Sequence, residues 1–210
     1  MPFRPMPRPG PMAAAAAAAG LALAVTACGG GTSTTASGSS GSATGQTLTL
    51  ALTQQPFINY NPWAAPNGIN SGLWNNGPLY DSLTKLNAQG QPVPSVATSW
   101  QVNGNAVTLQ LRSGIKFSDG TPLDAAAVKT NLDYGASHPN GAECNAYIAG
   151  LKTTVLSPTS VKLALPHPIP GLLQDFAQCA GFMVSPKALA NPGSLTSTPD
   201  GSGPYTLDKS

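Results

Sequence analysis

The stretch LQLRSGIKFSDGTPL, residues 109–123, decides how the middle of the chain folds. Its first residues, Leu109–Leu111, alternate apolar and polar side chains, which is the pattern of a half-buried strand. The pairs Ser113-Gly114 and Asp119-Gly120 then mark two tight turns on either side of a short apolar segment. The stretch therefore predicts a strand that runs into two successive turns.

The sequence on both sides of this stretch predicts a hairpin and a helix. Upstream, Trp100–Val102 and Val107–Leu111 flank Asn103-Gly104, and Asn-Gly between alternating strands is the strongest short hairpin signal. Downstream, the carboxylate of Asp124 can accept hydrogen bonds from the free N–H groups of a first helical turn. We therefore expect a helix over Ala125–Tyr134.

Further from the centre, local patterns predict a second hairpin and several shorter elements. The strands Thr153–Leu156 and Val161–Leu165 are joined through Ser157–Thr159, which contains a proline. Pro170 suits a first helical turn, so Leu172–Phe176 is expected as a short helix. Three other expected elements are a strand over Thr47–Thr53, a helix within Ile69–Leu86 and a strand from Tyr205 to Leu207. Together these patterns indicate a mixed α/β or α+β fold.

The composition argues against nucleic-acid binding. Only 9% of the 210 residues are charged, against about 25% in an average soluble domain. No run of Lys or Arg is present to neutralise phosphates. The formal net charge of +2 comes from the extreme N-terminus, because 10 basic residues less Arg4 and Arg8 equal the 8 acidic ones. A nearly neutral surface of Ser, Thr, Asn, Gln and Gly suits a secreted protein.

The N-terminus has the regions of an export signal. Arg4 and Arg8 precede the run Ala13–Val25, which is apolar except for one glycine. A membrane span needs about 20 apolar residues, so this run is too short for one. The segment Leu23–Cys28 resembles the lipobox of bacterial lipoproteins, which implies a lipid on Cys28. An ordinary secretory signal with an unrelated cysteine is the alternative. Residues 29–45 are nearly all Gly, Ser, Thr and Ala and are expected to form a flexible tether.

Five motifs then follow one another in an order typical of one family. They are LYDSL (79–83), PSVATSW (94–100), LQLRSGIKFSDGTPL (109–123), VSPKAL (184–189) and GSGPY (201–205). In this order they resemble the extracellular solute-binding proteins of family 5, the dipeptide- and oligopeptide-binding proteins of ABC importers. The resemblance runs from about Thr47 to the last residue. Ala126, Ala127 and Asp200 depart from the residues usual in the family.

The resemblance implies a two-lobed, periplasmic-binding-protein-like type II fold, of which this chain holds the N-terminal part of lobe I and a subdomain inserted into it. Because solute is bound between two lobes, the chain alone is expected to bind poorly. The implied boundaries are a lipoprotein signal peptide over 1–27, a lipidated cysteine and tether over 28–46, the first part of lobe I over 47–82, the inserted subdomain over 83–185 and a return to lobe I over 186–210.

The candidate solute-binding residues are Gln54, Gln55, Asn59 and Tyr60. They follow the first expected strand, and ligands usually sit at strand ends in open α/β sheets. In peptide binders of the resembled family the ligand lies extended, with its backbone paired to protein strands. The resemblance places the acid that pairs with a peptide ammonium group in the other lobe. An ordinary solvated loop is the alternative interpretation of these four residues.

Several residues that could suggest chemistry are expected to have structural roles. Arg112 lies beside a hairpin and Asp119 in an Asp-Gly turn. Gly201–Pro204 lack the Gly-Lys-Ser of a phosphate loop, and their proline lacks a backbone donor, so they are expected to let the chain cross between lobes. His138 and His167 lack the spacing of a zinc site or of a Ser-His-Asp triad. We therefore expect no metal, no cofactor and no catalytic residue.

Cys144 and Cys179 are the cysteines that remain after Cys28. Export places them in an oxidising compartment, where an even pair favours a disulfide. Such a bond would close a loop of about 35 residues and would contribute roughly 3–4 kcal/mol on the chain-entropy model. Two buried thiols are the alternative.

These observations favour a monomeric solute-binding lipoprotein of an ABC importer that is not an enzyme. It would bind a peptide or other small solute outside the cell and deliver it to the ABC permease and ATPase subunits. Lipid on Cys28 would hold it on the outer face of the plasma membrane, with no role for nucleic acid. The alternatives are a similar lipoprotein with a sensing or adhesion role and no importer, and a secreted hydrolase.

Overall fold

The computed structural model describes residues 59–64, 76–139 and 142–207. Within these ranges no helix is long and apolar enough to cross a membrane. The elements in chain order are β1 (Thr84–Leu86), β2 (Pro92–Pro94), β3 (Ala97–Asn103), β4 (Ala106–Leu111), α2 (Ala125–Ser137), the 3₁₀ helix η1 (Glu143–Ile148), β5 (Lys152–Ser157), β6 (Ser160–Ala164), α3 (Leu172–Asp175), η2 (Cys179–Gly181), α4 (Pro186–Leu189) and η3 (Pro192–Thr196).

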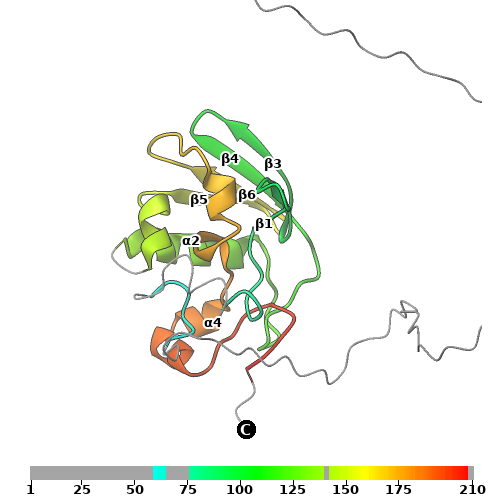
Figure 1. Cartoon of the computed structure of the whole chain (residues 1–210), viewed down its shortest axis with the longest axis vertical. Coiled ribbons are helices and arrows are strands. Elements are labelled where there is room, and N and C mark those ends of the chain that lie inside the picture. Colours follow the sequence, from blue (N-terminus) through cyan, green and yellow to red (C-terminus); the bar gives the residue numbers. More distant parts are fainter. Residues whose placement is uncertain (1–58, 65–75, 140–141, 208–210) are drawn as a thin grey trace, which may run out of the picture. The chain divides into compact units, whose positions relative to one another are not determined.

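The main sheet has four antiparallel strands in the order β3-β4-β6-β5 (Figure 1). Both predicted hairpins are confirmed, because β3 pairs with β4 and β5 pairs with β6. The two hairpins are joined through β4 and β6, where Leu109 lies opposite Val161. The chain therefore has the predicted mixture of sheet and helices.

The turn of the first hairpin differs by one residue from the predicted one. Asn103 still belongs to the ladder and pairs with Ala106, so Gly104 and Asn105 are the two loop residues. Gly104 has a φ of 61°, whereas Asn105 does not have a positive φ. Glycine at the first of two loop positions is the pattern of a type II′ turn, which also matches the twist of a hairpin.

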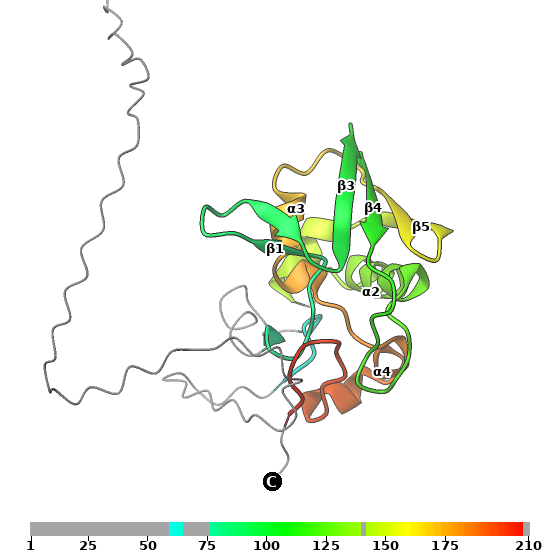
Figure 2. The same ribbon diagram turned by 90° about the vertical axis from the view of Figure 1, so that its right-hand side faces the viewer.

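Helix α2 begins where Asp124 predicts it. The Asp124 carboxylate accepts hydrogen bonds from the N–H groups of Ala126 at 2.9 Å and Ala127 at 3.0 Å. The helix continues to Ser137, three residues beyond the predicted end. Figures 1 and 2 both place α2 beside the main sheet, which it contacts through β5 and β6.

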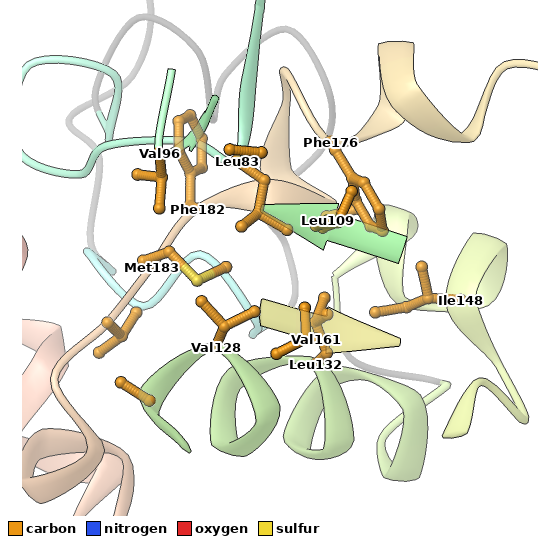
Figure 3. Close-up of a cluster of buried hydrophobic side chains, with 14 of the residues drawn as sticks. Leu83, Val96, Leu109, Val128, Leu132, Ile148, Val161, Phe176, Phe182 and Met183 are labelled. Atoms are coloured by element: carbon orange, nitrogen blue, oxygen red, sulfur yellow. The ribbon is translucent and has the colours of Figure 1, made fainter. Parts of the chain in front are cut away.

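The hydrophobic core lies between α2 and the sheet. Val128 and Leu132 project from α2 toward Leu109 and Val161 of the central strands (Figure 3). All four side chains are fully buried. Burying each such side chain contributes about 1.5–3 kcal/mol, so this layer holds the helix on the sheet. Phe176, Phe182 and Met183, from a later part of the chain, complete the cluster (Figure 3).

The helix predicted within Ile69–Leu86 is wrong from residue 77 onward, where a turn over 77–79 is followed by an isolated bridge between Ser82 and Phe182. Its first part, residues 69–75, lies outside the described residues. Thr84–Leu86 form strand β1, which pairs with β2. The N–H groups of Leu83 and Thr84 donate to the carbonyls of Gly181 and Phe176 at 2.9 and 3.3 Å. These long-range hydrogen bonds hold the backbone extended despite its helical spacing of apolar residues.

The strand predicted from Tyr205 to Leu207 is also wrong. These residues are irregular, although the N–H of Tyr205 donates to the carbonyl of Pro78 at 3.1 Å. Pro204 has no N–H, so the chain cannot continue a regular ladder there. The predicted helix Leu172–Phe176 is confirmed except that it ends one residue earlier, at Asp175. The strand expected over Thr47–Thr53 lies outside the described residues.

Candidate functional site

Asn59 and Tyr60 lie in the short loop formed by residues 59–64, which we call the Trp63 loop. The side-chain oxygen of Asn59 accepts from the N–H of Asn61 at 2.8 Å, and the N–H of Tyr60 donates to the carbonyl of Leu195 at 3.1 Å. Both residues are half-buried. The other two candidates, Gln54 and Gln55, and the lipidation candidate Cys28 lie outside the described residues.

A buried phenol also holds Tyr60. The hydroxyl of Tyr80, which is 1% exposed, donates to the carbonyl of Tyr60 at 2.8 Å. Burial raises the pKa of Tyr80 well above its ordinary value, so this hydroxyl keeps its proton and remains a donor. The N–H of Tyr80 in turn donates to the carbonyl of Asn76 at 2.9 Å. The Asn76 amide is fully buried, and neither of its side-chain atoms has a hydrogen-bond partner among the described residues.

Trp63 fixes the loop to the rest of the protein. Its ring is 1% exposed, and its Nε1–H donates to Oδ1 of Asn131 at 3.2 Å. Its carbonyl accepts from the N–H of Ala142 and from the side-chain nitrogen of Asn145, both at 3.1 Å. The edge of the ring lies against Gly135 of α2, where no Cβ could be accommodated without movement. Contacts with α2 and with the beginning of η1 therefore hold the loop in place.

Asn131 is the residue that joins the Trp63 loop to α2 and to the segment before α4. Its nitrogen donates to the carbonyls of Ala127 at 3.0 Å and Val184 at 2.7 Å. Its oxygen accepts from the N–H of Val184 at 2.8 Å as well as from Trp63. All four hydrogen-bonding positions of the amide are thus used. Sequence reasoning missed this residue, because an asparagine within an amphipathic helix carries no local signal of a buried partner.

Cys144 and Cys179 are joined by a disulfide in the structure, with Cα atoms 5.8 Å apart. Both residues are 1% exposed. The bond links η1 to η2, and the neighbouring Asn145 donates to the carbonyls of Trp63 and His138. The disulfide therefore stabilises η1, whose Asn145 contacts the Trp63 loop.

The residues that could suggest chemistry take part in local contacts. A guanidinium nitrogen of Arg112 donates to the carbonyl of Ser95 at 3.0 Å. The Asp119 carboxylate accepts from the N–H of Thr121 at 2.8 Å and from its hydroxyl at 2.6 Å. His138 makes a 2.8 Å contact with the carbonyl of Tyr134 at the end of α2. In the described part of the chain, no three His, Cys, Asp or Glu residues are grouped so that they could hold a metal ion.

Two surface hollows lie on either side of α2, with volumes of about 570 and 450 Å³. Asp133 and Ser137 line both of them. Asp133 forms an ion pair with Lys129 one turn earlier on the helix. Neither Asn59 nor Tyr60 lines either hollow, so the sequence-predicted residues and these hollows are separate features.

Solved structures with a similar fold are periplasmic binding proteins. NikA from Brucella suis in complex with Fe(III)-EDTA has a TM-score of 0.62 and 27% sequence identity, covering 73% of this chain and 32% of NikA. The Escherichia coli murein tripeptide binding protein MppA has a TM-score of 0.60 and 25% identity, covering 73% and 34%. An ABC transporter substrate-binding protein from Sinorhizobium meliloti has 0.56 and 26%, covering 74% and 32%. The chain therefore has part of the periplasmic-binding-protein type II fold.

The sequence comparisons define the family. Residues 91–210 match the family described as bacterial extracellular solute-binding proteins, family 5 middle. The glutathione-binding protein GsiB of Escherichia coli (strain K12) is 34% identical over 156 residues, which cover 72% of this chain and 30% of GsiB. The chain belongs to family 5 of the bacterial extracellular solute-binding proteins. It spans about 30% of the length of the curated relatives that it matches, and these are solute-binding proteins rather than enzymes.

Proposed function

We propose that this chain is part of a receptor that captures a small solute outside the cell and delivers it to the permease of an ABC importer. The match of residues 91–210 to family 5 carries this proposal. One similar structure is an ABC transporter substrate-binding protein, which supports the importer role. Binding followed by release of the unchanged solute needs no catalytic group, so we propose that the protein is not an enzyme.

A peptide-type solute is the class that we propose. Two relatives are named for such ligands, glutathione and a murein tripeptide. A peptide bound in extended form is held mainly through its backbone, so the protein needs amide and hydroxyl groups more than charges. The low charged fraction of 9% agrees with this mode of recognition.

Within this proposal, Asn59 and Tyr60 act from the Trp63 loop, together with Gln54 and Gln55. A loop that is already held in place loses less conformational entropy when a ligand binds, which favours affinity. The contacts of Trp63 with Asn131 and Ala142 supply that rigidity. The half-buried ring of Tyr60 offers an apolar face with limited freedom of movement.

We further propose the division of the chain into lobe I (47–82 and 186–210) and an inserted subdomain (83–185). The contacts between the two lobe I segments support it. The N–H groups of Gly203 and Tyr205 donate to the carbonyls of Leu79 and Pro78 at 3.0 and 3.1 Å. We also propose that residues 1–27 are a signal peptide. Lipid on Cys28 and a tether over 28–46 would then hold the receptor on the outer face of the plasma membrane. The positive n-region, the apolar run and the lipobox-like segment support this location.

Calorimetric titration with glutathione and a tripeptide tests the proposed solute class and the role of Tyr60. The titration uses the protein with both lobes, purified with its anchor from the membrane fraction of the cells that produce it, because the chain alone is expected to bind poorly. Tyr60→Ala is expected to weaken binding at least about fivefold, the equivalent of roughly 1 kcal/mol. Tyr147→Ala is the matched control, because this tyrosine is 37% exposed in η1 and outside the Trp63 loop. If both variants lost affinity equally, Tyr60 would not belong to the binding site. Titrations in which neither ligand releases or absorbs heat would count against a peptide solute.

A further inference from the structure

The turn at residues 117–121 and the segment at residues 200–205 are held together by a compact set of hydrogen bonds. The N–H and the hydroxyl of Ser118 both donate to the carbonyl of Gly201 at 2.9 Å. The N–H of Asp119 donates to a carboxylate oxygen of Asp200 at 3.2 Å. The N–H of Ser185 donates to the carbonyl of Asp200 at 2.9 Å. The two segments are 81 residues apart in sequence, and Figure 1 shows the red C-terminal part beside this green turn.

Close packing makes this junction sensitive to small changes. A Cβ on Gly201 would lie 2.2 Å from the carbonyl oxygen of Leu79 and 2.5 Å from the ring of Tyr80. Gly201 is therefore required for the segment to pass between the turn and residues 79–80. The hydroxyl of Ser202 also reaches the carboxylate of Asp81 at 3.3 Å.

Two carboxylates meet at this junction in different surroundings. Desolvation pushes the pKa of Asp119 upward, but hydrogen bonds from Thr121 and Ser185, together with the charge of Lys187, outweigh it and lower that pKa. Desolvation raises the pKa of Asp200, and the negative charge of Asp119 raises it further. Together they outweigh the lowering effect of hydrogen bonds such as the one from the Asp119 N–H. The N–H of Asp119 donates to the Asp200 carboxylate at 3.2 Å, and the Ser185 hydroxyl donates to the Asp119 carboxylate at 2.8 Å. The two carboxyl groups therefore meet at one junction, where a protonated Asp200 can donate to Asp119.

We propose that Asp119 and Asp200 form a carboxylate pair that takes up one proton as the surroundings become acidic, and that this proton fastens residues 200–205 to the 117–121 turn. In the described part of the chain, the pair is also faced by Lys187, which attracts Asp119, and by Tyr80, which is neutral. The carboxylate of Asp81 is the third acid at the junction and is reached through Ser202. The device joins the proposed subdomain to the proposed lobe I and does not depend on which solute is bound.

The sign of the pH dependence follows from the two shifts. The folded-state pKa of Asp200 is raised above 3.8, so its contribution to stability is present at low pH and is lost as pH rises through the raised value. The folded-state pKa of Asp119 is lowered below 3.8, so its contribution is present above 3.8 and is lost as pH falls through the lowered value. The junction is therefore most stable between these two values, with one proton on the pair.

Carbon-13 NMR titration of the side-chain carboxyl groups in the purified protein tests the pairing. Asp200 is expected to titrate above 3.8 and Asp119 below it. In Asp119→Asn the midpoint of Asp200 is expected to fall, because the neighbouring charge is gone. Asp175 is an internal control, since burial alone raises its pKa, and it should not move in this variant. A midpoint of Asp200 at or below 3.8, or one unchanged by Asp119→Asn, would overturn the pairing.

Amide hydrogen exchange tests whether protonation of the pair strengthens the attachment of residues 200–205 to the 117–121 turn. Asp200→Asn serves as a mimic of protonated Asp200, because its side chain is uncharged at every pH. In the wild type, the protection factors of the Ser118 and Ser185 N–H groups are expected to rise as the pair takes up its proton. In Asp200→Asn they should be high and independent of pH in that range. The N–H of Leu111, at the end of β4, donates to the carbonyl of Thr159 in the turn between β5 and β6 and is the reference. Protection that is unchanged or falls on acidification in the wild type, relative to Leu111, would contradict the proposal.

Discussion

Replacing Gly135 by alanine tests how rigidly the structure holds Trp63. The new Cβ would lie 2.4 Å from Cζ3 and 2.7 Å from Cε3 of the Trp63 ring, and 2.9 Å from Cδ1 of Ile148. Carbon atoms in contact are normally about 3.5–4.0 Å apart, so the ring would have to move by about 1 Å. The ring is 1% exposed and is hydrogen-bonded to Asn131, so it has no free direction in which to move.

The expected cost of Gly135→Ala follows from opposing contributions. Alanine favours a helix interior over glycine by about 1 kcal/mol. Overpacking a filled core costs about 1–3 kcal/mol, and weakening the hydrogen bond from Trp63 adds about 0.5–1.5 kcal/mol. We therefore expect the free energy of unfolding to fall by about 1–3 kcal/mol, because the steric cost exceeds the gain in helix propensity.

Urea unfolding followed by far-ultraviolet circular dichroism measures this loss. Trp63→Leu is the partner variant for a double-mutant cycle, because it removes the ring that Gly135→Ala would displace. In the Trp63→Leu background the alanine should be nearly neutral or mildly stabilising, which gives a coupling energy of about 1 kcal/mol or more. A wild-type stability for Gly135→Ala, or an equal loss in both backgrounds, would refute the tight contact.

Three further changes test separate features. Replacing Cys144 and Cys179 by alanine is expected to lower the free energy of unfolding by about 3–4 kcal/mol, because the disulfide no longer closes a loop with a sequence separation of 35. If non-reducing mass spectrometry found two free thiols in the exported wild-type protein, the disulfide would be excluded. Asp124→Ala should cost about 1 kcal/mol in urea unfolding and Asp124→Asn much less, because asparagine retains a capping oxygen, whereas equal losses would argue against the cap. Cys28→Ala is expected to abolish fatty-acid labelling and release the protein from the membrane fraction, and persistent labelling would rule out the proposed anchor.

The sequence predicted the elements whose causes are local. The two hairpins follow from alternating strands around short turns, and Asp124 has its partners only two and three residues away. Even the misplaced turn at Gly104 was wrong by a single residue, because the ladder extends to Asn103. Patterns over a few residues are sufficient where the stabilising contacts are equally short-range.

The contacts that position the candidate site could not be predicted, because they join distant residues. Trp63 and Asn131 are 68 residues apart, and Asn131 and Val184 are 53 apart. Thr84 lies in a stretch whose apolar residues have helical spacing, yet it belongs to a strand because its N–H donates to the carbonyl of Phe176. Only the fold brings such partners together, and no local pattern of polar and apolar residues records them.

Native mass spectrometry of the protein purified from the cell envelope measures most directly whether it binds a small solute without changing it. The expected result is a complex carrying one small molecule, with a peptide-like mass, that is recovered intact after denaturation and after prolonged incubation. Protein that stays ligand-free in the presence of a mixture of peptides, or that releases a converted product, would contradict the proposed function.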